Sequence, residues 1–307
     1  MISVVVPVKN GGTDLVRCLE AIARQEVADE VEVVVVDSGS TDGTPERARR
    51  LGARVHELEA AEFNYGRSRN LGVDLSRGEI LVFTSHDASA ADTGWLARLV
   101  APLASPEVAG VYGRQLPYED APPTERYFLD FLYGPRPRVQ RLTDPRELTF
   151  ETTLFSNVNS AIPRRVWEEH PFAEDVVGSE DQEWSRRVLL AGRTIVYEPR
   201  AAVFHSHTYT LSGAFRRFFD SGVASKRSYL GGGSRSRRAL ADAALRYASG
   251  ELGWLWRTGR RRWIPYAVVL ELAKFTGLQL GRRHRLLPKG FVRRVTLLPA
   301  YWERDRA

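Results

Sequence analysis

Two runs of β-branched residues constrain the fold more than any other feature of this sequence. Residues 2–6 and 31–36 are dominated by Val and Ile. Such nearly continuous apolar runs are typical of parallel strands, which are buried on both faces. Between them, residues 14–24 place apolar side chains at helical spacing. This β-α-β order predicts a sheet whose neighbouring strands run parallel.

The same alternation continues through the first hundred residues. We expect strands at residues 54–57 and 79–84, and helices at 44–51, 66–75 and 93–103. The predicted fold class is therefore α/β, with a mostly parallel central sheet flanked by helices. Ligands of such sheets bind beyond the carboxyl ends of the strands. Asp37 and Asp87 both follow predicted strands and are expected at that edge.

The later part of the chain divides into a middle and a basic end. Residues 117–145 contain six prolines, which predicts an irregular loop region near the acceptor. Regular structure is expected to return with strands at 155–162 and 194–197 and a helix at 181–191. The glycine run at 231–233 predicts a hinge. We expect a catalytic domain at residues 1–230 and a basic amphipathic helical extension at 231–307.

Charge and cysteine content exclude several classes of protein. The net charge is +6, but residues 1–207 carry −9 and residues 208–307 carry +15. The acidic body and the lack of a DNA-binding motif argue against a nucleic-acid partner. The single Cys18 excludes a disulfide framework and a cysteine zinc site. The first residues lead into a strand without a basic segment, so we expect no signal peptide and a cytoplasmic location.

Several polar segments have the residue types that catalysis requires. Asp37 opens a polar turn whose carboxylate can accept hydrogen bonds from a base or ribose. Asp87, with His86 beside it, is a candidate ligand for Mg²⁺ or Mn²⁺, since these cations favour oxygen. Asp181 begins a helix in a carboxylate-rich segment and is a candidate general base. Each has an ordinary structural alternative, as a turn residue, a loop residue or a helix-start carboxylate.

Two further segments add nitrogen donors. His205 and His207 alternate along an extended segment and would point to one side, where one of them can complete a metal site or donate to a diphosphate. Arg69 opens a helix and can reach a base or a phosphate. A lone histidine or a helix arginine is more often structural. These residues indicate a functional site only when they are considered together.

Taken together, the segments resemble family 2 glycosyltransferases of the GT-A fold over roughly residues 1–210. The resemblance rests on residues 4–10, 34–44, 69–72 and 78–83 leading to Asp87, and then on Ser179-Glu180-Asp181, Arg187, Ala191-Gly192, Pro199 and His205. It implies an inverting transfer of a sugar from a nucleotide-diphosphate donor to an acceptor hydroxyl. The sequence departs from the family at Ser85, where the DxD motif has its first Asp.

The resemblance also implies a role for each matching residue. Asp181, with Glu180 beside it, matches the general base. Asp87 and His205 match the metal site. The donor site is implied at Pro7, Val8, Lys9, Asn10, Asp37, Ser38, Arg69, His86 and Asp87.

Residues 63–72, Asp87-Ala88 and 204–209 resemble bacterial rhamnosyltransferases, which use dTDP-L-rhamnose to build surface polysaccharide on a lipid carrier. A UDP- or GDP-sugar donor is the alternative within the same chemistry. An alternative of another class is a non-catalytic nucleotide-sugar-binding membrane scaffold. The acceptor is expected to be a saccharide or a lipid-linked saccharide.

The basic C-terminal third mixes Arg with Trp, Leu and Tyr. Residues 263–280 are apolar but interrupted by Glu271 and Lys274, so they do not predict a spanning helix. Trp and Arg beside a moderately apolar helix favour a helix in the membrane interface, attracted by anionic lipid. We therefore expect peripheral attachment at the inner face of the cell membrane. The alternatives are packing against the catalytic body or a homodimer contact.

Overall fold

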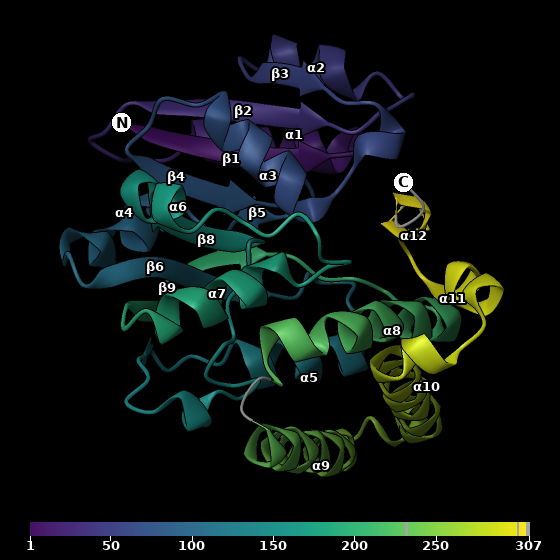
Figure 1. The fold of residues 1–307 in the computed structure, drawn as a ribbon. Helices are drawn as coiled ribbons and strands as arrows, with labels where there is room; N and C mark the ends of the chain where they lie inside the picture. The colour runs from purple at the N-terminus through teal and green to yellow at the C-terminus, as the bar shows by residue number, and fades with distance from the viewer. Residues whose placement is uncertain (231–232, 300, 305–307) are drawn as a thin grey trace.

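The computed structural model describes residues 1–230, 233–299 and 301–304, and nine strands in these residues form one sheet (Figure 1). Its order is β3-β2-β1-β4-β8-β6-β9-β5, with β7 paired to β9. The strands are β1 (Ile2–Val8), β2 (Val31–Asp37), β3 (Arg54–Glu57), β4 (Ile80–Thr84), β5 (Ser89–Ala90), β6 (Val108–Leu116), β7 (Arg138–Gln140), β8 (Asn159–Pro163) and β9 (Thr194–Phe204).

The sheet has a parallel half and a mixed half. Strands β3, β2, β1 and β4 pair parallel, as do β6 and β9. Antiparallel pairing enters through β8, which lies between β4 and β6, and through β5 and β7 on β9. The expected α/β fold with a mostly parallel sheet is confirmed.

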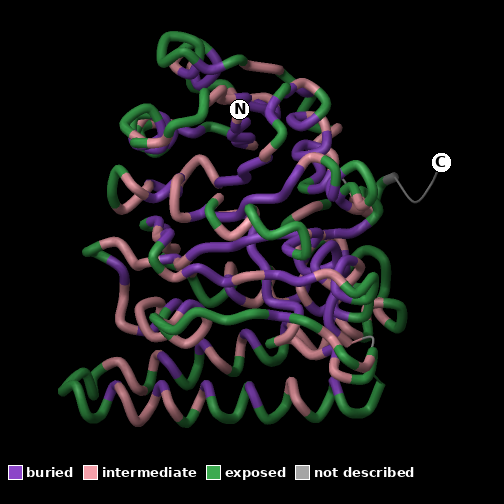
Figure 2. The backbone as a smooth tube through the Cα atoms, turned by 90° about the vertical axis from the view of Figure 1, so that its left-hand side faces the viewer, coloured by how far each residue is buried: buried purple, intermediate pink, exposed green. Residues whose placement is uncertain are grey.

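Helices cover both faces of the sheet because its central strands are apolar on both sides. On β1, Val4 and Val6 pack with α1 (Gly12–Ala23), α2 (Thr44–Arg50) and α4 (Trp95–Val100). Val5 points the other way, into a core with α3 (Tyr65–Asp74), α6 (Arg164–Glu169) and α7 (Glu180–Leu190). The buried residues accordingly run through the strands in the middle of the molecule (Figure 2).

The expectation of an irregular loop at residues 117–145 is wrong. The segment contains α5 (Pro123–Leu132) and β7, followed by a 3-10 turn at Pro145–Glu147. The prolines flank these elements instead of interrupting them. Pro123 occupies the first turn of α5, where its fixed φ suits a helix start and its missing N–H is not needed. Proline content alone therefore overstated the irregularity.

Some element bounds also differ from those expected. The strand expected at 194–197 continues to Phe204, past Pro199, because its pairing with β6 shifts register between Gly113 and Arg114. The helix expected at 93–103 divides into α4 and a 3-10 turn at Ala101–Ala104. A further 3-10 turn lies at Ala60–Glu62.

The C-terminal third is helical, as expected. It comprises α8 (Leu211–Ser228), α9 (Ser234–Arg257), α10 (Ile264–Arg282), α11 (Lys289–Val295) and α12 (Tyr301–Arg304), with 3-10 turns at Arg261–Trp263 and His284–Leu286. Gly231 and Gly232 of the expected hinge lie outside the described residues. No helix in the described part of the chain has the length and apolar character needed to cross a membrane.

Helices α8 and α10 lie on either side of the expected domain boundary and pack closely together. Their backbones approach at Gly222, Gly277 and Gly281. A Cβ added to Gly281 would lie 2.0 Å from the carbonyl oxygen of Phe219. Only glycine permits this approach. Helix α8 thus links the sheet to the basic helices along the bottom and the right-hand side of Figure 1.

Candidate active site

The carboxyl ends of β1 and β2 form the first part of the site. Val8 and Asp37 are register partners, so the loops that follow them are adjacent. Asp37 is buried and accepts hydrogen bonds from the backbone N–H groups of Gly39 and Ser40, at 3.1 and 2.9 Å. These bonds close a tight turn at the sheet edge.

Hydrogen bonds join this turn to the loop after β1. The Asn10 backbone N–H donates to Ser40 Oγ at 2.7 Å, and the Thr41 N–H donates to Asn10 Oδ1 at 2.9 Å. Pro7 is half-buried, whereas the side chains of Lys9 and Asn10 are exposed. Ser38 is buried, and its hydroxyl has no hydrogen-bond partner within the described residues. The two loops therefore form one polar rim, and the sequence-predicted donor residues 7–10, Asp37 and Ser38 all lie on it.

Asp87, His205 and His207 form the second part of the site. Asp87 follows β4, and the two histidines follow β9. Asp87 Oδ1 lies 3.6 Å from His205 Nε2, and Asp87 Oδ2 lies 3.8 Å from His207 Nδ1. One donor atom from each side chain falls within 4.8 Å of the others, an arrangement that fits a metal ion.

The proton of His205 is placed by Gln115, on β6. Gln115 Nε2 donates to Ser156 Oγ at 3.0 Å, which leaves its Oε1 to accept from His205 Nδ1 at 2.9 Å. The lone pair of His205 therefore lies on Nε2, the atom nearest Asp87. Burial lowers the pKa of His205 to about 3, so the ring is neutral near pH 7. Hydrogen bonds of this kind orient histidine ligands in metal sites.

Asp87 is ionised in this cluster. Burial opposes its charged form, but His205, His86 and His207 together lower its pKa below the ordinary value. Tyr118 also donates a hydrogen bond to the Asp87 backbone oxygen, at 3.1 Å, and so holds the loop. The sequence-predicted residues His86, Asp87 and His205 are thus brought together.

Asp181 and Glu180 open α7 and form the third part of the site. Glu180 is buried and pairs with Arg69 Nη1 at 2.9 Å. Asp181 is half-buried and accepts from the backbone N–H groups of Asn157 and Gln182, at 3.2 and 2.8 Å. The guanidinium of Arg69 is thus turned toward the carboxylate pair. Of the two carboxylates, only Asp181 is free of an ion pair among the described residues.

The environment of Asp181 suits a group that takes a proton near neutral pH. Burial, and then the charge of Glu180, raise the pKa of Asp181 to about 7, although Arg69 opposes the shift. A general base is most effective when its pKa lies near the working pH.

Hydrogen bonds connect the second and third parts. Gln115 contacts His205 on one side and Ser156 on the other, and the next residue, Asn157, donates to Asp181. The segment before β8 therefore holds the carboxylate of Asp181 in a fixed relation to the Asp87–His205 pair. The chemistry that this arrangement permits is proton removal beside a cation site.

Two residues of the site were not predicted, Gln115 and Arg217, which lies on α8. Gln115 had no sequence signal, because it lies 90 residues from His205 in the sequence. Of His205 and His207, the sequence indicated one metal ligand, and the structure places both beside Asp87.

Arg217 is exposed, and among the described residues it makes no hydrogen bond or ion pair. Its Cζ lies 5.5 Å from the centre of the Tyr209 ring, which lies 5.2 Å from the His207 ring. Burial lowers the pKa of His207, and the charge of Arg217 adds to this effect. Burial raises the pKa of Glu125, on α5, and the charge of Arg217 opposes it. A free guanidinium therefore lies beside the cation site.

Comparison with known proteins gives a consistent picture. The family model for glycosyl transferase family 2 matches residues 3–170. The chain is 31% identical to the O-antigen chain rhamnosyltransferase RfbN of Salmonella typhimurium, over 98% of this chain and 96% of that protein. It is 29% identical to the O-antigen chain rhamnosyltransferase WbaN of Salmonella anatum, over 98% and 95%.

Solved structures share the fold. The mannosyltransferase PcManGT from Pyrobaculum calidifontis, in complex with GDP-Man and Mn²⁺, matches with a TM-score of 0.62 and 22% identity, over 90% of this chain and 86% of that one. TarS of S. aureus in complex with UDP-GlcNAc matches with a TM-score of 0.52 and 17% identity, over 92% of both chains. The GT-A fold expected from the sequence is confirmed. The chain is a glycosyltransferase enzyme and belongs to glycosyl transferase family 2.

Proposed function

We propose that this enzyme transfers L-rhamnose from dTDP-L-rhamnose to a hydroxyl of a saccharide or lipid-linked acceptor, with inversion, in the synthesis of a surface polysaccharide. The donor sugar is supported by the near full-length similarity to two O-antigen chain rhamnosyltransferases. The chemistry is supported by Asp181, a half-buried carboxylate of raised pKa tied by hydrogen bonds to the Asp87–His205 pair.

In the proposed reaction, Asp181 removes the proton of the acceptor hydroxyl. The oxygen then attacks the anomeric carbon in a single displacement, and the bond to the nucleoside diphosphate breaks with inversion. Glu180 and Arg69 position Asp181, because their buried ion pair fixes the start of α7 against α3. The rim formed by residues 7–10 with Asp37 and Ser38 binds the nucleoside, with the Asp37 carboxylate facing its base or ribose.

The Asp87, His205 and His207 donors fit a divalent cation, Mg²⁺ or Mn²⁺, because a carboxylate and two imidazoles converge and His205 presents its lone pair. When bound there, such a cation would supply charge stabilisation to the diphosphate. His86, beside Asp87 in the same loop, helps to lower the pKa of the Asp87 carboxyl group.

Arg217 supplies a second, protein-borne positive charge on the diphosphate in this proposal. Arg217 is exposed, and its guanidinium has no hydrogen-bonding or ionic partner among the described residues, so its donors are not occupied there. Fixed cations aimed at a leaving group stabilise the charge that develops during bond breaking. Arginine is also suited to bind phosphate oxygens through two hydrogen bonds at once.

Membrane association is part of the proposal and is supported by α10. Val268, Val269, Leu272 and Phe275 are exposed, between 41% and 60%. They follow helical spacing and form one apolar stripe, defined here as the α10 stripe. With +15 on residues 208–307, the stripe favours attachment of the helices at 231–307 to an anionic cytoplasmic leaflet, as a unit distinct in role from residues 1–230.

Protection from thermal unfolding by nucleotides tests the donor assignment. A ligand present at 100 times its Kd stabilises the folded state by about 2.7 kcal/mol. We expect dTDP and dTDP-rhamnose to protect more than the UDP and GDP counterparts, and Mg²⁺ or Mn²⁺ to increase the effect. Stronger protection by a UDP- or GDP-sugar would replace the donor. Binding of dTDP-rhamnose without turnover on any saccharide acceptor would favour a non-catalytic binder.

A further inference from the structure

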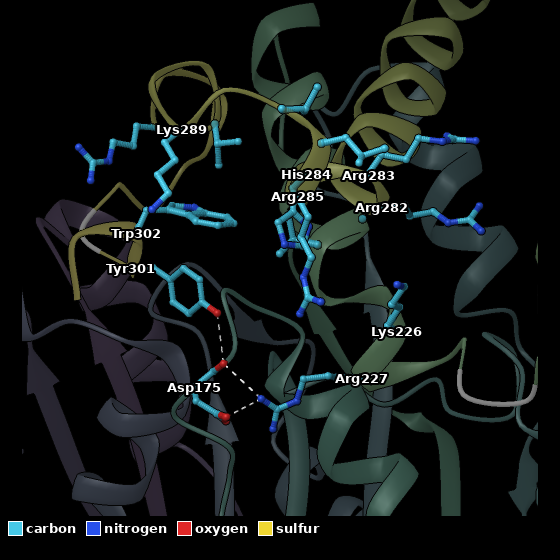
Figure 3. A pocket seen from close by; sticks show the side chains of 16 residues that line it. Asp175, Lys226, Arg227, Arg282, Arg283, His284, Arg285, Lys289, Tyr301 and Trp302 are labelled. Atoms are coloured by element: carbon cyan, nitrogen blue, oxygen red, sulfur yellow. Dashed lines mark hydrogen bonds and ion pairs between the residues drawn. The ribbon is translucent and has the colours of Figure 1, made fainter. Parts of the chain in front are cut away.

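A basic pocket lies between the C-terminal ends of α8 and α10 and the segment that follows α10 (Figure 3). Its volume is about 750 Å³. Within the described chain, seven Lys and Arg side chains and one carboxylate, Asp175, line it. The basic residues include Lys226, Arg227, Arg282, Arg283, Arg285 and Lys289.

Most of this positive charge has no counterion among the residues that the structure describes. Asp175 pairs with Arg227 at 2.5 Å. Among the described residues, the side chains of Arg282 and Arg283 donate only to oxygens of Gln279, which is neutral. Arg285 and Lys289 are exposed and make no hydrogen bond or ion pair with the rest of the described chain. The lining therefore carries six more positive charges than negative ones.

Helix ends explain only part of this arrangement. Cations near the C-terminal ends of α8 and α10 interact favourably with the helix dipoles, which accounts for Lys226, Arg227 and Arg282. Arg285 and Lys289 lie beyond α10, yet they line the same space. A second hollow of about 390 Å³ shares Lys226, Arg282 and Arg283 and adds Arg237 from α9. The positive surface thus continues past the pocket.

We propose that the basic pocket binds the phosphate or diphosphate group of a lipid. The cations match phosphate oxygens, which accept several charge-assisted hydrogen bonds at once. The lipid source follows from the position of the pocket at the end of α10, because the α10 stripe exposes apolar side chains along the same helix. This step rests on the membrane association proposed above.

The pocket connects to the catalytic site through two segments. Asp175 lies six residues before Asp181, and Arg227 contacts Asp175. Along α8, the ten residues from Arg217 to Arg227 span about 15 Å. The lining of the pocket is therefore continuous, through Asp175, with the segment that leads to Asp181. The phosphate belongs either to a lipid-linked acceptor or to a membrane phospholipid.

Paired charge deletions in the full chain test the proposal. Arg285→Ala with Lys289→Ala removes two pocket charges without removing a hydrogen bond or ion pair among the described residues. Arg238→Ala with Arg262→Ala removes two exposed charges that do not line the pocket. Binding is measured to inorganic pyrophosphate in a chelator, and to phosphatidylcholine vesicles containing phosphatidate. At about 1 kcal/mol for each charge, the pocket variant should lose about 30-fold in vesicle affinity and the control markedly less.

The two probes separate the sources. If the unaltered protein binds pyrophosphate saturably and only the pocket variant loses this binding, the site is assigned to the diphosphate of a lipid-linked acceptor. If the protein does not bind pyrophosphate, and only the pocket variant loses vesicle binding, the site is assigned to a membrane phospholipid. Equal losses in both variants, or no binding of either probe by the unaltered protein, overturn the proposal. Protection by dTDP, measured in the same variants, reports the donor site separately.

Discussion

Gln115 takes no part in the proposed reaction, but its side chain orients a residue of the site. It accepts the Nδ1 proton of His205, so His205 presents its lone pair beside Asp87. Gln115→Leu should weaken Mn²⁺ binding by about 10–100-fold, as loss of such orienting bonds does elsewhere. Gln115→Glu retains an acceptor and should keep most of the affinity. Titration of the nucleotide-free protein with Mn²⁺ measures both variants, and equal affinities would remove Gln115 from the site.

Asp181 carries the prediction on catalysis. Asp181→Asn should lower kcat by about 10²–10⁴-fold, the usual contribution of a general base, and leave donor affinity nearly unchanged. Because its pKa is raised to about 7, the unaltered enzyme should lose activity as the pH falls through 7 and the carboxylate takes up a proton. A pH–rate profile tests this, since Asp181→Asn should lack that limb. Retained turnover in the variant would exclude Asp181 as the base.

The site residues that were predicted from the sequence lie directly after a strand or at the start of a helix. Asp37 and Asp87 were predicted because the carboxyl ends of parallel strands meet at one edge of the sheet, and Asp181 because it begins a helix in a carboxylate-rich segment. Gln115 and Arg217 were not found, because each meets the site only through tertiary contacts. A local sequence pattern does not indicate a contact between residues that are 90 positions apart, such as the contact of Gln115 with His205.

Among the elements, the contact of α3 with α7 depends on one buried ion pair. Arg69 and Glu180 have side chains only 7% and 5% exposed. Arg69→Ala would leave Glu180 buried without its cation and should cost about 3–5 kcal/mol of unfolding free energy. Arg67→Ala, on the same helix, breaks an exposed pair with Glu62 and should cost less than about 1 kcal/mol. Denaturant unfolding compares them, and equal costs would contradict the stabilising role of the buried pair.

The contact of α8 with α10 depends on glycine. Gly281→Ala would place a Cβ 2.0 Å from the Phe219 carbonyl oxygen, so the helices must separate. We expect a loss of about 1–3 kcal/mol, the usual cost of overpacking. Gly290→Ala, on α11, meets no atom within 4 Å and is the matched control. Thermal unfolding of both variants measures the difference, and an unaffected Gly281→Ala would mean that the two helices adjust freely.

Helices and strands were predictable where the spacing of apolar residues follows one regular pattern. The strands β1 and β2 followed from their apolar runs, and α1 from its spacing. Helix α5 was missed because the six prolines of residues 117–145 predicted a loop, whereas Pro123 suits the start of a helix and Leu129 joins the core. Strand β9 is longer than expected because a register shift in its pairing with β6 accommodates Pro199.

For the whole molecule, the separation of charge and the α10 stripe lead to one expectation about where the enzyme works. An acidic body and a basic helical end would orient the molecule on an anionic bilayer, and the stripe would then enter the interface. High salt should weaken only the electrostatic attraction of the basic end, because salt screens charge but not the apolar contact of the α10 stripe.

Removing the apolar part therefore separates the two contributions. Leu272→Ser with Phe275→Ser should lower vesicle affinity by about 100-fold, since burial of two large apolar side chains contributes about 3 kcal/mol. Val139→Ser with Leu190→Ser makes the same kind of change at exposed positions on the catalytic body and should bind vesicles normally. Flotation at low and high salt measures both. If the α10 variant floats like the control under both conditions, the stripe is not inserted, and attachment would depend on the basic charge alone.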